Sequence, residues 1–236
     1  MATSDLGQGV TLRELADREA HAAALAEAVS AALHAALAAR GAALLIVSGG
    51  RSPVPFLERL AKAELDWGKV TVTLADERWV PIDDPDSNAG LLRQHLFQGP
   101  AAAAQFVDLY SPANSPEEGM ALTEIRLRET LGTPDVLVLG MGDDAHTASL
   151  FPGSPGLEEA LDPASERLSF PGVAPSAPRR RITLSRAYLS RARQQILAIQ
   201  GAGKRQVLET ALAEGDELAT PIKAFLREPL VVYWCP

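Results

Sequence analysis

The sequence predicts an α/β fold: a mostly parallel, doubly wound sheet with helices on both faces. Short aliphatic or β-branched runs alternate with longer stretches of helical composition, which is typical of repeated strand–helix–strand units. Several runs are apolar throughout, as in strands buried on both faces. The runs also break abruptly into Gly, Ser, Asp or His. Because the carboxyl ends of parallel strands meet at one edge of a sheet, these polar residues are expected to gather at one site.

The N-terminal region is expected to be a tail followed by a long helix. Residues 1–9 are small and polar, so we expect them to be frayed. From Leu12 to Arg40 the abundance of Ala, Leu and Glu favours a helix, and Gly41 is suited to end it. An apolar residue recurs every four positions, which predicts one buried face. This stripe consists of Leu25, Val29, Leu33 and Leu37.

The remaining strands and helices follow from apolar runs and from helix-start residues. Strands are expected at 42–47, 70–75, 105–110, 136–139, 182–184, 195–199 and 230–234. Helix starts are expected near Pro53, at Ser87 or Asn88, at Ser115 and after Gly201. Residues 152–178 are rich in Pro, Gly and Ser, so we expect a loop-rich excursion with a short helix near 157–161. We treat 1–236 as a single domain.

Charge and cysteine content narrow the classes of function. The net charge of −8 argues against binding to nucleic acid or to an anionic membrane, because both need an excess of Lys and Arg. Cys235 is the one cysteine, which excludes an internal disulfide and a cysteine-based metal site. The chain has no signal-peptide pattern at its start. We therefore expect a cytoplasmic protein, as a monomer or alternatively a dimer.

The stretch Gly140–Gly153, GMGDDAHTASLFPG, is the first candidate for the chemistry. It follows the apolar run 136–139, so its polar groups lie at the carboxyl end of a predicted strand. Histidine is the side-chain type whose ordinary pKa suits proton transfer near neutrality, which makes His146 a candidate acid–base group. Asp144, two residues earlier, is placed to orient its imidazole. We expect Asp143 to be a solvent-facing turn residue.

Two further strand ends carry polar groups. SGGRSP at 48–53 connects a predicted strand to a helix, an arrangement that presents backbone N–H groups to a phosphate; a plain tight turn is the alternative. Asp76, Glu77 and Arg78 end the next strand, and a solvated charge cluster is the alternative there. Lys204, in GAGK at 201–204, opens a helix after another strand. In this acidic chain it is a suitable partner for a phosphate dianion.

Read together, these blocks resemble the 6-phosphogluconolactonase family. They are SGGRSP at 48–53, LADERWVP with a later SN at 74–88, LGMGDDAHTASLFPG at 139–153, RITL at 181–184 and GAGK at 201–204. The order is kept over nearly the whole chain, and the third block is the most specific. The resemblance implies a sugar-phosphate-isomerase-like fold, no cofactor, no metal, and hydrolysis of a phosphorylated sugar lactone in the oxidative pentose phosphate pathway.

The resemblance also implies roles for individual residues. His146 would act as general base and then as acid, with Asp144 orienting it. Arg78 would meet the developing oxyanion or bind substrate oxygens. The phosphate and sugar would be bound by Ser48, Gly49, Gly50, Ser52, Asp76, Arg181 and Lys204. A Ser149 nucleophile is not expected, since G-x-S-x-G is absent around it.

This chain departs from the family at Ala145, where Gly is usual between the Asp and the His. A positive φ at this position would strain an alanine by on the order of 1 kcal/mol or more, whereas a negative φ would not.

Two rival functions remain to be weighed. Amino-sugar-6-phosphate deaminases/isomerases carry a Glu where this chain has Phe151, and a Tyr where it has Arg78. A sugar-phosphate sensor of a transcription regulator would carry a basic helix-turn-helix segment, which the Ala-rich N-terminal region lacks.

Overall fold

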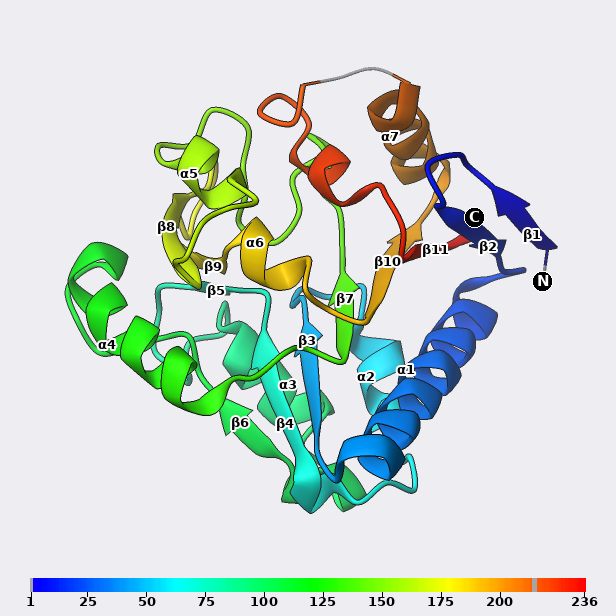
Figure 1. Cartoon of the computed structure of the whole chain (residues 1–236), viewed down its shortest axis with the longest axis horizontal. Helices are drawn as coiled ribbons and strands as arrows, with labels where there is room; N and C mark the ends of the chain where they lie inside the picture. The colour runs from blue at the N-terminus through cyan, green and yellow to red at the C-terminus, as the bar shows by residue number, and fades with distance from the viewer. Residues whose placement is uncertain (1, 214–215) are drawn as a thin grey trace.

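The computed structural model describes residues 2–213 and 216–236 and contains two sheets (Figure 1). The larger sheet has the strand order β1-β2-β11-β10-β7-β3-β4-β6. Its strands are β1 (Ala2–Asp5), β2 (Thr11–Glu14), β3 (Ala43–Val47), β4 (Val70–Leu74), β6 (Gln105–Val107), β7 (Val136–Leu139), β10 (Gln194–Gln200) and β11 (Leu230–Cys235). The smaller sheet has the order β5-β9-β8, formed by β5 (Asp76–Arg78), β9 (Arg180–Leu184) and β8 (Ser169–Val173).

The helices follow the strands in alternation. They are α1 (Arg18–Arg40), α2 (Val54–Leu60), α3 (Asn88–His95), α4 (Pro116–Thr130), α5 (Leu157–Leu161), α6 (Arg186–Leu189) and α7 (Ala202–Ala213). Three short 3₁₀ turns, η1 (Trp67–Lys69), η2 (Gly99–Ala103) and η3 (Pro221–Phe225), complete the described elements. Apart from the antiparallel pair β1–β2, every pairing in the large sheet is parallel. The predicted α/β class is confirmed.

The strand order reverses between β3 and β7. From β3 the chain continues outward through β4 to β6, whereas from β7 it continues in the opposite direction through β10 to β11. Parallel crossovers are almost always right-handed, so this strand order puts α1, α2 and α3 on one face of the sheet and α4, α6 and α7 on the other. The sheet is therefore doubly wound. A reversal of this kind opens a crevice at the carboxyl ends of the two strands, here β3 and β7.

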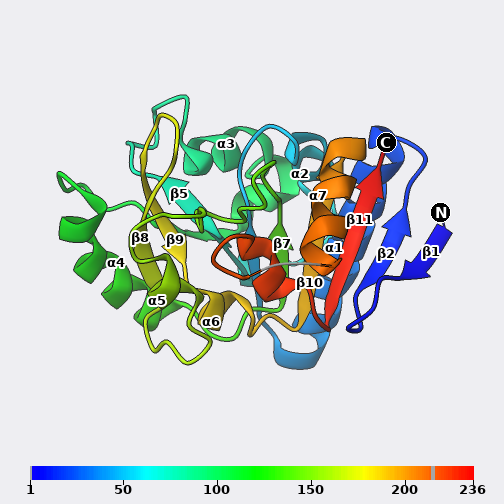
Figure 2. The ribbon, with the colours of Figure 1, turned by 90° about the horizontal axis from the view of Figure 1, so that it is seen from above.

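The N-terminal segment is a β-hairpin and not the predicted frayed tail. Residues 2–5 pair with β2, and β2 pairs in parallel with β11, with Leu12 opposite Val232. Leu12 is buried, and the hairpin covers an edge of the sheet that would otherwise expose unpaired backbone groups. The hairpin and the C-terminal strand β11 consequently lie next to each other in the sheet (Figure 2).

Helix α1 therefore begins later than predicted. Asp17 caps it by accepting a hydrogen bond from the Ala20 N–H at 2.8 Å. Gly41 ends it with a φ of 73°, as predicted. By length and hydropathy alone α1 could span a membrane. In the structure its predicted stripe faces the core, where Leu25, Val29 and Leu33 are buried and Leu37 is partly buried.

The smaller sheet was not predicted as a separate sheet, although its strand β9 was expected at 182–184. Asp76–Arg78, expected as a loop at a strand end, forms β5 and pairs antiparallel with β9, with Arg78 opposite Arg181. The predicted excursion at 152–178 contains the expected helix α5, but it also contains β8. Pro171 and Gly172 within β8 hide the strand pattern, and Pro is tolerated because β8 is an edge strand.

Candidate active site

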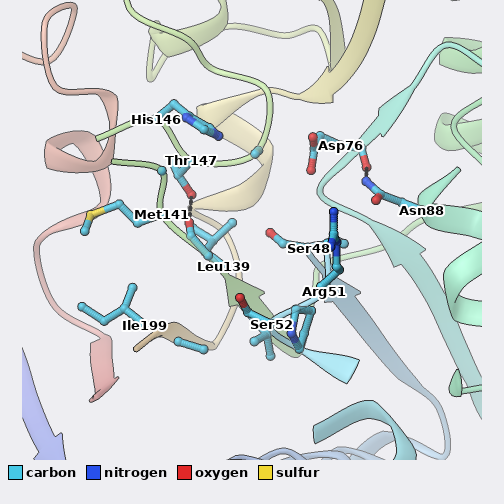
Figure 3. A pocket seen from close by; sticks show the side chains of 18 of the residues that line it. Ser48, Arg51, Ser52, Asp76, Asn88, Leu139, Met141, His146, Thr147 and Ile199 are labelled. Atoms are coloured by element: carbon cyan, nitrogen blue, oxygen red, sulfur yellow. Dashed lines mark hydrogen bonds between the residues drawn. The ribbon is translucent and has the colours of Figure 1, made fainter. Parts of the chain in front are cut away.

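The carboxyl ends of three strands, β3, β7 and β10, open into one cavity of about 270 Å³ (Figure 3). The loops after β3, β7 and β10 line it together with β5, at the β3/β7 reversal. Nine of the ten residues predicted from the sequence lie on its wall: Ser48, Gly49, Gly50, Ser52, Asp76, Arg78, His146, Arg181 and Lys204. The tenth, Asp144, contacts His146 directly. The structure thus brings the predicted residues together, although their individual roles stay predictions.

His146 and Asp144 form a hydrogen-bonded pair. Asp144 Oδ1 lies 2.5 Å from His146 Nδ1 and also accepts the His146 backbone N–H at 3.2 Å. Partial burial acts to raise the pKa of Asp144, but the hydrogen bonds and positive charge of His146 outweigh it, so this pKa is lowered. Asp144 therefore stays ionised near neutrality. A carboxylate at Nδ1 holds the proton on that nitrogen, which leaves the Nε2 lone pair free to act as a base.

The imidazole is fixed on two sides. A Cβ at Gly142 would lie 2.0 Å from His146 Nδ1, so only glycine leaves room for the ring. The Phe151 ring packs against the imidazole with the ring centroids 4.4 Å apart. The His146 side chain keeps 30% of its surface exposed, toward the cavity. The histidine is therefore held in one orientation while water can still reach it.

Ala145 adopts the strained conformation. Its φ is +62°, in the left-handed region, and the residue is buried. Its carbonyl accepts the Ile222 N–H at 3.0 Å, and its N–H donates to the Gly142 carbonyl at 3.2 Å, so the turn is held from both sides. The strain of roughly 1–2 kcal/mol expected for a non-glycine residue is present in this loop. Ala148, with φ of 49°, is a second such residue that the sequence did not indicate.

Substitutions at Ala145 measure this strain. We expect Ala145→Gly to change the free energy of unfolding by less than about 1 kcal/mol, because relief of strain is offset by a buried methyl lost and a more flexible unfolded chain. Ala145→Val should lower it by about 2 kcal/mol or more, since a β-branched side chain is added at positive φ in a filled site. Urea unfolding of both variants makes the comparison. A large destabilisation by glycine would show that the backbone is not strained.

Asp76 faces His146 across the cavity (Figure 3). It is buried, and its Oδ2 accepts a hydrogen bond from the Ser149 hydroxyl at 2.6 Å. The donor, Ser149, is not among the residues that line the cavity, and its exclusion as a nucleophile stays a prediction. A carboxylate on a cavity wall is suited to accept hydrogen bonds from sugar hydroxyls.

Arg78 and Arg181 form a cationic wall. They are directly opposite each other in the β5–β9 pair, so their side chains share one face of the small sheet. Burial and the neighbouring charge of Arg78 lower the pKa of Arg181. The Arg181 Nε donates to the Pro178 carbonyl at 2.8 Å, and Arg78 Nη1 donates to the Asp86 carbonyl at 2.6 Å. Both cations line the cavity, where an anionic or polarised oxygen would be stabilised.

The Gly-rich loop after β3 closes the other side of the cavity. Gly50 has a φ of +91°, which favours glycine. A Cβ at Gly49 would lie 2.0 Å from Asn88 Oδ1, so this backbone approaches the start of α3 closely. The Ser48 hydroxyl is buried and has no hydrogen-bond partner in the described structure. The loop thus presents backbone and hydroxyl groups to the cavity.

Lys204 lies in the first turn of α7, and it has a partner that the sequence did not indicate. Its Nζ is 2.8 Å from Asp143 Oδ1. Asp143 is exposed, as predicted, but it joins the His146 loop to α7 through this ion pair. A more highly charged anion entering the cavity can replace the exposed carboxylate as the partner of Lys204.

Sequence reasoning missed several residues of the cavity wall. His21 was assigned no site role from the sequence; it is buried, and its Nε2 is 3.1 Å from the Tyr233 carbonyl. Burial lowers the pKa of His21, against that hydrogen bond. Asn88 and Arg51 stood within recognised motifs but were given no site role. The missed wall residues include His21, Arg51, Asn88, Met141, Thr147 and Gln200. Among residues 2–213 and 216–236 no group of three His, Cys, Asp or Glu is placed to hold a metal ion.

Known proteins resemble this chain closely enough to identify its family. The family model of glucosamine-6-phosphate isomerases/6-phosphogluconolactonase matches residues 16–234. The chain therefore belongs to this family. It is 53% identical to the 6-phosphogluconolactonase of Pseudomonas aeruginosa, over 100% of both chains. The 6-phosphogluconolactonase of Pseudomonas putida is also 53% identical, over 98% of this chain and 95% of that one.

A solved structure of the same family also resembles this chain. A crystal structure of a 6-phosphogluconolactonase from Shewanella baltica superimposes with a TM-score of 0.93 and 37% identity, and the match covers 99% of this chain and 100% of that one. These three relatives, to which the chain is similar over nearly its whole length, are each named 6-phosphogluconolactonase.

Proposed function

We infer that this chain is a 6-phosphogluconolactonase, which hydrolyses 6-phospho-D-glucono-1,5-lactone to 6-phospho-D-gluconate in the oxidative pentose phosphate pathway. Full-length identity of 53% to enzymes of that name supports this inference. The observation that carries the chemistry is the His146–Asp144 pair at the wall of the cavity. The test follows the loss of lactone generated in situ from glucose 6-phosphate. A rate no faster than spontaneous hydrolysis in buffer would refute the inference.

We propose that His146 acts through Nε2. It takes a proton from a water molecule as that water attacks the lactone carbonyl, and the resulting imidazolium then protonates the ring oxygen as the C–O bond breaks. Asp144 stabilises the imidazolium at Nδ1. Arg78 stabilises the oxyanion of the tetrahedral intermediate. Atoms balance as lactone plus water giving the hydroxy acid, and this route uses no cofactor.

The phosphate is proposed to bind at the loop after β3 and at Lys204. Gly49, Gly50 and Ser52 line one side, and Lys204 reaches the cavity from α7. Asp76 and Arg181 contact the sugar between the phosphate and the reacting carbonyl. A phosphate dianion replaces Asp143 at Lys204, because it offers more charge and three acceptor oxygens. Local positive charge thus binds an anionic substrate although the whole chain is acidic.

Replacing Lys204 tests the phosphate site. We expect Lys204→Met to raise KM for the phosphorylated lactone about 10- to 100-fold, because a charge-assisted hydrogen bond worth about 1.5–3 kcal/mol is lost. Activity on unphosphorylated glucono-1,5-lactone should stay unchanged. Lys62→Met removes the same charge from an exposed position of the chain outside the cavity and serves as the control. An equal loss on both lactones would assign Lys204 to another part of the substrate.

The rival isomerase activity is disfavoured by Phe151. Aldose–ketose isomerisation needs a further proton-transfer group near the sugar. Phe151, at the position where the deaminase/isomerase carries a Glu, packs directly on the His146 ring and is buried. An apolar ring cannot transfer protons. We propose lactone hydrolysis as the single reaction of the site and a cytoplasmic, monomeric or dimeric enzyme as its setting.

A further inference from the structure

A buried carboxylate that has no place in the proposed chemistry links β5 to the start of α3. Glu77 is 0% exposed, between Asp76 and Arg78. Its Oε1 accepts the N–H groups of Arg78 at 2.7 Å and of Asn88 at 2.8 Å. Its Oε2 accepts the Ala89 N–H at 2.7 Å and the Ser87 hydroxyl at 3.2 Å. Four donors from two separate segments therefore converge on one side chain.

The residues on either side of Glu77 bind the same segment. The Asp76 carbonyl accepts a hydrogen bond from Asn88 Nδ2 at 3.0 Å (Figure 3). Arg78 Nη1 donates to the Asp86 carbonyl at 2.6 Å, and Asp86 immediately precedes the residues that Glu77 holds. These contacts form a closed ring from the Glu77 carboxylate through the start of α3 to the Arg78 guanidinium. We call this ring the β5–α3 clasp; it comprises residues 76–78 and 86–89.

Capping α3 does not by itself require Glu77. The Ser87 hydroxyl already caps the helix by accepting the Gly90 N–H at 3.1 Å. Burying a carboxylate is costly: burial raises the pKa of Glu77 to about 7, and hydrogen bonds from Asn88, Ala89 and Arg78 oppose that rise. The four donors offset this cost and fix where residues 87–89 lie. Asp86 immediately precedes these residues, so the position of its carbonyl depends on Glu77. That carbonyl in turn holds the Arg78 guanidinium, which faces the cavity.

We propose that Glu77 is a positioning residue for lactone hydrolysis. Its carboxylate fixes the start of α3, the Asp86 carbonyl holds one end of the Arg78 guanidinium, and the rest of that guanidinium is aimed at the reacting carbonyl. The Arg78 Nε is buried and has no hydrogen-bond partner among the described residues, so contacts with Asp86 and the cavity determine its orientation. This inference rests on the proposed role of Arg78.

A double-mutant cycle tests whether Glu77 acts through Arg78. Glu77→Gln keeps the shape but turns an NH₂ group toward N–H or O–H donors. We expect it to lower kcat about 10- to 100-fold, with little change in KM, because the guanidinium loses its alignment with the transition state. In an Arg78→Met background, the same change should lower kcat less than about 3-fold, since no guanidinium remains to be positioned. Equal losses in the two backgrounds would overturn the proposal.

Two further variants keep the test decisive. Ser87→Ala removes one of the four donors and should give a smaller loss of kcat that also disappears in the Arg78→Met background. This result stands in for Glu77→Gln if that variant does not fold. Glu124→Gln is the matched control: Glu124 accepts the N–H groups of Leu168 and Ser169 and the Ser169 hydroxyl, away from the cavity. It should lower the urea midpoint and leave kcat unchanged.

The cycle separates this inference from the proposed function. If Arg78→Met alone keeps full activity, the proposed role of Arg78 fails and the clasp has nothing to position. If Arg78→Met is strongly impaired and the losses are additive, only the inference about Glu77 is overturned.

Discussion

Replacing His146 with alanine is expected to lower kcat about 10²- to 10⁴-fold, the range for loss of a general acid–base group. The variant should still fold, because the side chain is 30% exposed and its partner Asp144 also faces solvent. KM should change little, since the proposed contacts of phosphate and sugar lie elsewhere on the wall. The measurement is the loss of lactone generated in situ, compared with the spontaneous rate.

The pH dependence of kcat/KM is an independent test of the role of His146. The lowered pKa of Asp144 keeps its carboxylate charged through the neutral range. A fall in kcat/KM on acidification that persists in Glu77→Gln but is absent in His146→Ala is then assigned to His146, and not to Asp144 or to Glu77, whose pKa burial raises to about 7. His34→Ala, an exposed substitution on α1, controls for the loss of a histidine. Full activity in His146→Ala would refute the mechanism while leaving the enzyme class intact.

Strand ends were the part of the site that the sequence could predict. An apolar run that breaks into polar residues marks a buried strand and the edge where it ends, so the loops at 48–53 and 139–153 were located from local pattern alone. Their convergence followed from the rule that parallel strands share one carboxyl edge. The local sequence pattern does not determine the order of the strands in the sheet. The reversal between β3 and β7, which opens the cavity, depends on long-range pairing.

The missed features share a physical cause. The N-terminal hairpin forms because β11 offers an open edge, and β5 forms because β9 lies beside it. Neither segment has a strand pattern of its own, since pairing with a distant partner determines its conformation. The positive φ of Ala145 is set in the same way, by hydrogen bonds of its turn with Gly142 and Ile222. From the sequence, Glu77 could be interpreted only as part of a charge cluster, because its four hydrogen-bond donors come together only when the chain folds.

Arg78 is the second residue whose loss should be severe. We expect Arg78→Met to lower kcat about 10²- to 10³-fold, because a well-aimed oxyanion donor contributes roughly 2.7–4 kcal/mol to the transition state. Arg78→Lys should recover only part of this loss. An ammonium keeps the charge, but its donors all sit on one nitrogen, so it does not span the Asp86 carbonyl and the cavity as the separate nitrogens of the planar guanidinium do.

The split between kcat and KM decides what Arg78 does. An oxyanion donor acts when charge develops, so its loss lowers kcat and kcat/KM together. A residue that only binds ground-state oxygens raises KM and leaves kcat unchanged, and that outcome would assign Arg78 to substrate binding. Arg180→Met provides the matched control: Arg180 is on β9 next to Arg181, so its side chain points to the opposite face of the small sheet. Its hydrogen bond to the Asn114 carbonyl is outside the cavity, and activity should be retained.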